Sequence, residues 1–126
     1  MPTASGSSQA GPRILIVEDE FLVADDIAMS LEDLGYAVIG PVATVSEALG
    51  LVAGEPIDGV VLDANLDGVS SAPVAAELTA RGVPFIVVTG YGRLDLPTSQ
   101  LNDAPRVTKP CNMAELGRVL ATVLRS

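Results

Sequence analysis

The sequence predicts an α/β fold in which five parallel strands form one sheet, doubly wound so that helices cover both faces. Short, unbroken apolar runs alternate with longer segments whose apolar residues recur at helical spacing. The connections are short, and right-handed crossovers between parallel strands place helices on both sides of a sheet. Hydrophobic residues make up 48% of the 126 positions, which is enough for the core of one domain.

Five segments are predicted to be strands, and the first of them is apolar at every position, as is typical of a strand covered on both faces. They span residues 14–17, 37–39, 57–62, 85–88 and 106–108. The second strand is expected to end at Gly40 and Pro41, a dipeptide that favours a turn.

The first two predicted helices carry recognisable signals at their ends. Apolar residues recur at helical spacing over residues 23–34, and Gly35 ends that helix. Thr44 and Glu47 form a capping box, in which the Glu47 carboxylate is expected to bind the backbone amide of Thr44. This box predicts a helix that continues to about Ala53.

Two further helices are predicted after the third and fifth strands. Ser71 precedes a helix that ends at Arg81, with Gly82 just past its end. Asn112 is expected to cap the last helix. A weaker pattern over residues 93–104, interrupted by proline, predicts a short helix between the fourth and fifth strands.

Charge balance and residue usage exclude several classes of function. Sixteen acidic residues against seven basic ones give a formal net charge of −9, so nucleic acid and an anionic membrane are poor partners. The chain has no histidine, which excludes a histidine-based catalytic triad. Cys111 is the only cysteine, so an internal disulfide is excluded and a reducing, cytoplasmic compartment is favoured. No apolar run in the sequence is long enough to span a membrane.

Residues 1–12 are rich in serine, glycine, alanine and proline, and they predict a flexible tail. The single folded domain is expected to cover residues 13–126.

Polar side chains follow four of the five predicted strands at their carboxyl ends. They are Glu18, Asp19 and Glu20 after the first strand, Asp63 and Asn65 after the third, Thr89 after the fourth and Lys109 after the fifth. Ligands of parallel α/β sheets bind at this edge of the sheet. The sequence therefore predicts one polar site to which these residues converge.

Clustered carboxylates and one amine at such a site favour a magnesium-dependent phosphoryl chemistry. Carboxylates repel one another unless a cation lies between them, and Mg²⁺ binds one or two carboxylates while bridging phosphate oxygens. A carboxylate can itself attack phosphorus to form an aspartyl phosphate. Lys109 is the only lysine of the chain, and its ammonium can follow a small phosphoryl group as a mobile point charge.

Structural explanations compete with this interpretation. The segment Asp63 to Gly68 matches the first half of a calcium loop, D-x-N-x-D-G, but the twelfth position is Val74 where a bidentate glutamate is needed. The acidic residues after the first strand could form only the charged first turn of a helix. Glu20 in particular is expected to be a solvated cap.

The order of these motifs resembles the receiver domain of two-component response regulators over nearly all of residues 13–126. The shared pattern is an acidic pair after strand one, aspartate after strand three, threonine after strand four and lysine-proline after strand five. The resemblance implies a flavodoxin-like (βα)5 fold with strand order 2-1-3-4-5. It also implies that Asp63 accepts a phosphoryl group from a histidine kinase or a phosphotransfer protein.

The same resemblance implies roles for the other polar residues. Mg²⁺ would be held by Asp19, Asp63 and the backbone carbonyl of Asn65, with Glu18 helping through water. Thr89 would move to bond a phosphoryl oxygen, and Lys109 would pair with it. The bond between Lys109 and Pro110 is expected to be cis.

Three departures from the family pattern affect the expected switch. The loop from Asp63 to Gly68 lacks the usual proline, and Arg106 stands where many receivers carry a switch tyrosine or phenylalanine. Residues 84–92 instead resemble a receiver subgroup with a Phe-x-x-Ala-Thr-Gly-Tyr signature, often paired with HWE-type histidine kinases, although Val88 replaces the alanine. Tyr91 is the candidate substitute for the switch aromatic.

The leading hypothesis is a stand-alone phosphoacceptor module that switches protein–protein contacts with a downstream protein and is not an enzyme. One alternative is a pseudo-receiver scaffold that binds partners regardless of phosphorylation. Another is an aspartate-nucleophile phosphohydrolase, but such enzymes resemble D-x-D-x-T at the nucleophile and this chain has Asn65 at the second acidic position.

Overall fold

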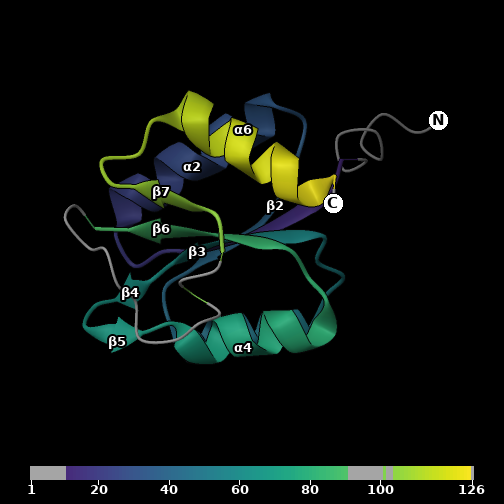
Figure 1. Ribbon diagram of the computed structural model, residues 1–126, viewed down its shortest axis with the longest axis vertical. Coiled ribbons are helices and arrows are strands. Elements are labelled where there is room, and N and C mark those ends of the chain that lie inside the picture. Colours follow the sequence, from purple (N-terminus) through teal and green to yellow (C-terminus); the bar gives the residue numbers. More distant parts are fainter. Residues whose placement is uncertain (1–10, 91–100, 102–103, 126) are drawn as a thin grey trace.

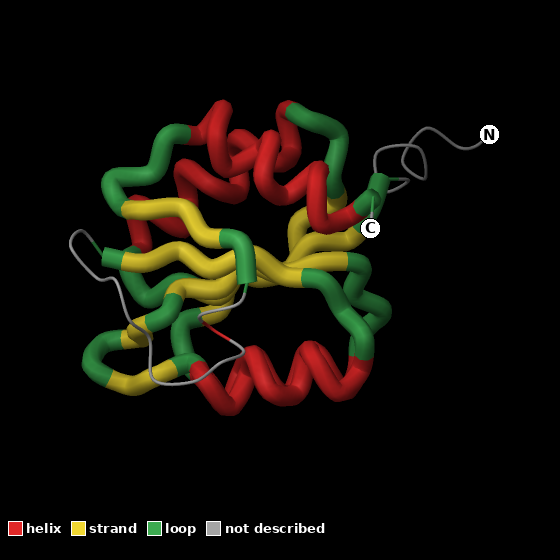
Figure 2. The backbone as a smooth tube through the Cα atoms, in the orientation of Figure 1, coloured by secondary structure: helices red, strands yellow, loops and turns green. Residues whose placement is uncertain are grey.

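The computed structural model describes residues 11–90, 101 and 104–125, and it places one central sheet between two layers of helices (Figures 1 and 2). The central strands are β1 (Arg13–Val17), β2 (Ala37–Val42), β3 (Gly59–Asp63), β6 (Phe85–Thr89) and β7 (Arg106–Thr108). The helices are α2 (Phe21–Asp33), α3 (Val45–Gly54), α4 (Ala72–Arg81) and α6 (Met113–Leu124).

The five central strands are all parallel and lie in the order β2-β1-β3-β6-β7. Counted along the chain among the central strands, this is the predicted order 2-1-3-4-5, so the fold class and the strand order are confirmed. The carboxyl ends of β1 and β3 are neighbours in this order, and β7 is separated from β3 by β6 alone. Residues that follow these strands are therefore brought to one edge of the sheet.

The core has two halves, one on each face of the sheet, because successive strand residues point to opposite faces. In β1, Ile14 and Ile16 pack with buried residues of α2 and α6, whereas Leu15 and Val17 pack with buried residues of α3 and α4. All four side chains are fully buried. This double burial explains why the strand is apolar at every position.

The predicted end signals of the helices are largely confirmed. The Thr44 hydroxyl accepts a hydrogen bond from the amide of Glu47 at 3.1 Å, and Asn112 caps α6 in the same way through the amide of Glu115 at 3.0 Å. The Glu47 carboxylate was predicted to bind the backbone amide of Thr44, and this prediction was wrong. It accepts from the amide of Ala43 at 3.2 Å and from the Thr44 hydroxyl, rather than from the Thr44 amide.

The second strand is longer than predicted, because β2 continues through Gly40 and Pro41 to Val42. Proline lacks an amide proton, but β2 lies at the edge of the sheet, where a proline can be accommodated. The carbonyl of Val42 accepts a hydrogen bond from the amide of Glu18 at 2.9 Å. The added length of β2 thus fixes the backbone at the start of the predicted site.

A small antiparallel hairpin, β4 (Asn65–Leu66) and β5 (Val69–Ser70), follows β3 and was not predicted. Asp67 and Gly68 form its turn with positive φ angles of 54° and 86°. Asp-Gly between extended residues is a strong hairpin signal, although the sequence analysis compared these residues only with a calcium-loop pattern that they do not complete.

Two predicted segments, the short helix after the fourth strand and the N-terminal tail, lie largely outside the described residues. The short helix over residues 93–104 lies outside them except for Leu101 and Ala104, and Leu101 is fully buried on the α3–α4 side of the core. The predicted tail also lies mostly outside, although the carbonyl of Pro12 accepts a hydrogen bond from the amide of Ala37 at 2.9 Å. Within the described part of the chain, none of the helices combines the length and the apolar character needed to cross a membrane.

Candidate functional site

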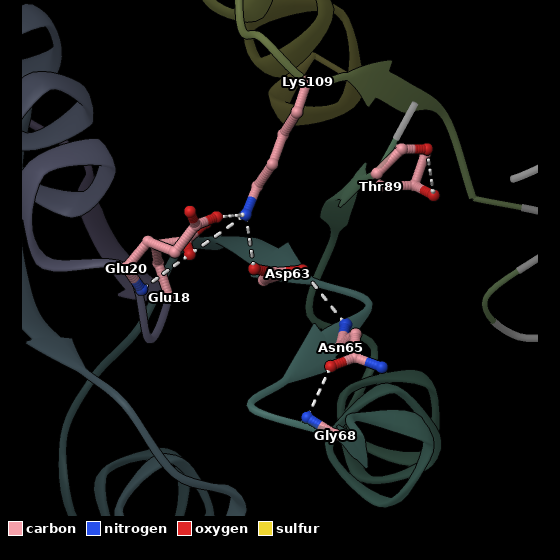
Figure 3. Close-up of polar contacts among 8 residues, drawn as sticks. Glu18, Glu20, Asp63, Asn65, Gly68, Thr89 and Lys109 are labelled. Carbon is pink, nitrogen blue, oxygen red and sulfur yellow. Dashed lines mark hydrogen bonds and ion pairs between the residues drawn. The ribbon is translucent and has the colours of Figure 1, made fainter. Parts of the chain in front are cut away.

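The candidate site lies at the carboxyl edge of the sheet, where Lys109 reaches from the end of β7 toward Asp63 at the end of β3 (Figure 3). The Nζ atom of Lys109 lies 2.9 Å from Oδ2 of Asp63 and 3.2 Å from Oε2 of Glu18, a residue that follows β1. The Lys109 amine also contacts the Glu20 carboxylate. The structure thus brings together side chains that follow three different strands, as their positions at the strand ends predict.

Glu18 is buried, and its two carboxylate oxygens differ in their surroundings. Oε2 accepts hydrogen bonds from the amide of Glu20 at 2.9 Å and from Lys109. Oε1 is buried with no hydrogen-bond partner. Burial, together with the neighbouring Asp63 carboxylate, raises the pKa of Glu18 to about 7, although Lys109 opposes this rise. A buried, unpaired carboxylate oxygen is costly, and a bound cation would satisfy it.

Asp63 is held by the backbone that follows it. Its Oδ1 accepts a hydrogen bond from the amide of Asn65 at 3.0 Å, while Oδ2 faces Lys109. The Asn65 side chain accepts from the amide of Gly68 at 2.7 Å and so supports the hairpin turn. The unpredicted hairpin therefore helps to orient the aspartate at the end of β3.

The three acidic residues after β1 do not have the expected arrangement. Glu18, Glu20 and Asp63 each offer an oxygen, and these oxygens lie within 4.8 Å of one another, whereas half-buried Asp19 is not part of this group. Asp19 lines a groove with residues of the β2–α3 connection and of the hairpin. Its role as a metal ligand stays a prediction.

Glu20 is exposed at the N-cap position of α2, as expected, but its side chain does not act as a cap. It makes no capping hydrogen bond and instead contacts Lys109. Glu20 has an extended backbone, and in extended chain residues two apart point to the same side. The spacing of Glu18 and Glu20 is the signal that could have placed both beside Lys109.

Lys109 stays charged in this surrounding. Burial by itself would lower the pKa of its ammonium, but the contacts with Glu20, Asp63 and Glu18 outweigh burial and raise the pKa. The Lys109 amide donates to the carbonyl of Thr89 at 2.8 Å, which aligns β7 with β6 at the site. The peptide bond between Lys109 and Pro110 is cis.

Thr89 is buried at the end of β6 and lies apart from the Lys109 contacts (Figure 3). Its hydroxyl donates to the carbonyl of Gly90 at 3.5 Å, which is a long hydrogen bond. The structure does not bring the Thr89 hydroxyl into the group around Lys109. Tyr91, the candidate switch aromatic, lies outside the described residues, and Arg106 belongs to β7.

The charges of the site are suited to a divalent cation. Three carboxylates and one ammonium leave a net charge of −2 when all are ionised, and oxygen ligands are those that Mg²⁺ prefers. The unpaired oxygen of Glu18 adds a ligand atom that nothing else in the described part of the chain engages.

Comparisons with known proteins agree with this geometry. The family model of the response regulator receiver domain matches residues 14–121. The solution structure of SdrG from Sphingomonas melonis Fr1 is 40% identical, covers 92% of this chain and 98% of its own, and superposes with a TM-score of 0.79. The regulator PhyR of Methylorubrum extorquens is 33% identical over 114 residues, which are 88% of this chain and 43% of PhyR.

A third similar protein bears on the metal. The receiver domain of the sensor histidine kinase PA1611 from Pseudomonas aeruginosa PAO1 was solved with a magnesium ion coordinated in its active-site cleft. It is 27% identical, covers 93% of this chain and 100% of its own, and has a TM-score of 0.75. The chain spans about half the length of the curated relatives it matches. The family model covers most of the chain, and with the fold and the site this shows that the protein belongs to the response regulator receiver domains of two-component signalling.

Proposed function

We propose that this protein is a phosphoacceptor module, in which Asp63 takes a phosphoryl group from a phosphohistidine on a histidine kinase or a phosphotransfer protein. The observation that supports this most strongly is the Lys109 ammonium within 2.9 Å of a buried aspartate that ends β3. Phosphorylation adds about −1.5 to −2 charge. We infer that this charge changes the contacts that the surface makes with a downstream protein.

The residues present fit Mg²⁺, which would be held by Asp63, Asp19 and the backbone carbonyl of Asn65, with Glu18 beside them. Support comes from the unpaired oxygen of Glu18 and from the net negative charge of the group. When bound, such a cation offsets the negative charge of phosphoryl oxygens.

The transfer step needs a nucleophile and a positive charge opposite it. A carboxylate oxygen of Asp63 attacks phosphorus, and the P–N bond of the phosphohistidine breaks. Its electron pair returns to the imidazole nitrogen, which is left neutral when the other ring nitrogen carries a proton. Lys109 then pairs with a phosphoryl oxygen, and the Thr89 hydroxyl leaves its long bond to Gly90 to do the same.

Several narrower features belong to the same proposal. The signature in residues 84–92 supports the Phe-x-x-Ala-Thr-Gly-Tyr subgroup and an HWE-type kinase as partner. The single cysteine supports a cytoplasmic location. We assign no phosphohydrolase activity, because position 65 carries an amide that the hairpin engages, and an amide cannot act as the second acid. A scaffold role without phosphorylation is disfavoured because Asp63, Thr89 and Lys109 are all present.

Phosphorylation by a small phosphodonor tests the proposal without knowledge of the kinase. We expect the intact mass of the protein to increase by one phosphoryl group when it is incubated with phosphoramidate and Mg²⁺. Excess EDTA should abolish the increase, because the transferring phosphoryl group then meets uncompensated carboxylates. An equal mass increase with Mg²⁺ and with EDTA would contradict the proposed magnesium site.

A further inference from the structure

The Lys109 amine has three carboxylate partners, and they differ sharply in exposure. The side chains of Glu18 and Asp63 are 1% and 4% exposed, whereas that of Glu20 is 56% exposed. Glu20 projects from the start of α2 and reaches the amine beside Glu18 (Figure 3). The amine therefore lies between two buried acids and one acid at the surface.

Both buried acids also belong to the proposed magnesium site, together with Asp19 and the backbone carbonyl of Asn65. An entering divalent cation and the ammonium would compete for Glu18 and Asp63, because two positive charges at such short range repel each other. Even if Mg²⁺ takes the unpaired Oε1 of Glu18, this repulsion weakens the contacts of the amine with the two buried acids. Glu20 is the remaining partner, and with no capping hydrogen bond its side chain is free to follow the amine.

The surroundings favour Glu20 as the acceptor of the displaced amine. Glu20 and Lys109 line one recess together with four apolar or weakly polar residues and one other acid, which are Val23, Pro110, Cys111, Met113 and Asp26. Among the residues that line this recess, Glu20 is the carboxylate already in contact with the amine.

We propose that Glu20 is a positioning residue, which holds the Lys109 amine at the site when Mg²⁺ takes Glu18 and Asp63. The inference rests on the magnesium site of the proposed function. Without Glu20 the displaced ammonium would lose the one carboxylate of this recess that it already contacts. Glu20 thus lowers the free-energy cost of metal binding and keeps the amine close to the phosphoryl position.

A double-mutant cycle on Mg²⁺ affinity tests this role without any phosphorylation. The dissociation constant of Mg²⁺ is measured by calorimetry for the wild type, Glu20→Gln, Lys109→Met and the double variant. We expect Glu20→Gln to weaken binding about three- to fivefold in the wild type, as suits a partly exposed ion pair. In the Lys109→Met background the same change should alter affinity less than about twofold. An equal loss in both backgrounds would show that Glu20 acts on the metal directly, and no loss in the wild type would also overturn the proposal.

A second measurement keeps the test valid if Lys109→Met fails to fold. Lys109 is the only lysine, so labelling the protein with isotopic lysine gives one set of side-chain NMR signals. With Mg²⁺ bound, the ε-methylene signal of Lys109 should stay broad in the wild type and narrow in Glu20→Gln, because the amine loses its partner. Identical signals in the two proteins would contradict the proposal.

Two controls separate this inference from simple charge effects and from the function itself. Glu32→Gln removes the same charge from the exposed far end of α2, about 18 Å along the helix, and should leave the affinity unchanged. Glu20→Asp keeps a carboxylate and should recover part of the loss. If the wild type binds no Mg²⁺ at all, the proposed magnesium site fails together with this inference. If it binds Mg²⁺ but the cycle shows no coupling, only the role of Glu20 fails.

Discussion

Asp63→Asn is expected to abolish phosphorylation of the protein by phosphoramidate and by any kinase that phosphorylates the wild type. An amide oxygen is a far weaker nucleophile than a carboxylate, and the acyl phosphate cannot form without the carboxylate. We expect the rate of labelling, followed by intact mass, to fall at least about 100-fold. The fold should persist, because asparagine has nearly the same shape and its single amide oxygen can still accept the hydrogen bond from the amide of Asn65, although the contact with Lys109 is lost.

Asp67→Asn is the matched control for this experiment. Asp67 lies four residues further on, in the turn of the hairpin, where its positive φ of 54° is one that asparagine also adopts. This variant loses the same charge and should be labelled at the wild-type rate. Labelling of Asp63→Asn at the wild-type level would move the phosphoacceptor to another residue.

Lys109→Met is expected to destabilise the metal-free protein by about 2–4 kcal/mol at pH 8. The change leaves the carboxylates of Glu18 and Asp63 buried without their ammonium partner. The free energy of unfolding is measured by urea denaturation in EDTA, with circular dichroism as the probe. Adding Mg²⁺ in place of EDTA should restore much of the free energy of unfolding of Lys109→Met, because the bound cation then replaces the amine beside the two carboxylates.

The stability lost in Lys109→Met should depend on pH, and the pKa of Glu18 gives the direction. The pKa of Glu18 is raised from its ordinary value of 4.5 to about 7, so the fold favours the protonated form. The stabilisation from this shift is fully present below pH 4.5 and is lost as the pH rises through 7. The cost of removing Lys109 should therefore be smaller at pH 6 than at pH 8. A cost that is the same at both pH values would contradict the role of Glu18.

Arg81→Gln is the control for the loss of an ion pair as such. Arg81 pairs with Glu77 on the exposed surface of α4, one helical turn apart. Exposed pairs of this kind contribute little, so the variant should change the free energy of unfolding by less than about 1 kcal/mol. A loss as large as that of Lys109→Met would mean that burial of the partners does not matter.

The sequence predicts the sheet and the position of the site well because both follow from simple periodicities. Four unbroken apolar residues in β1 require burial on both faces, and parallel strands then bring Asp63 and Lys109 to the same edge of the sheet. The caps at Thr44 and Asn112 are local, since each depends on an amide three residues away. Such features need no knowledge of the tertiary structure.

The errors concern features that depend on geometry or on neighbouring strands. Glu20 is solvent-exposed at the helix start, as its type and position suggest, but its contact with Lys109 depends on the tertiary structure and was missed. The extension of β2 past Pro41 depends on its place at the edge of the sheet. The hairpin at Asp67 and Gly68 was missed although its Asp-Gly turn is a local signal, because the sheet it forms has only two residues in each strand.

A structure of the protein with Mg²⁺ and beryllofluoride, an analogue of the phosphoryl group that binds carboxylates, tests the central claim most directly. The account predicts beryllium on a carboxylate oxygen of Asp63, with Nζ of Lys109 and the hydroxyl of Thr89 bonded to its fluorides, and Mg²⁺ next to Glu18 and Asp19. Beryllium on a different carboxylate, or a Lys109 side chain turned away from it, would contradict the account.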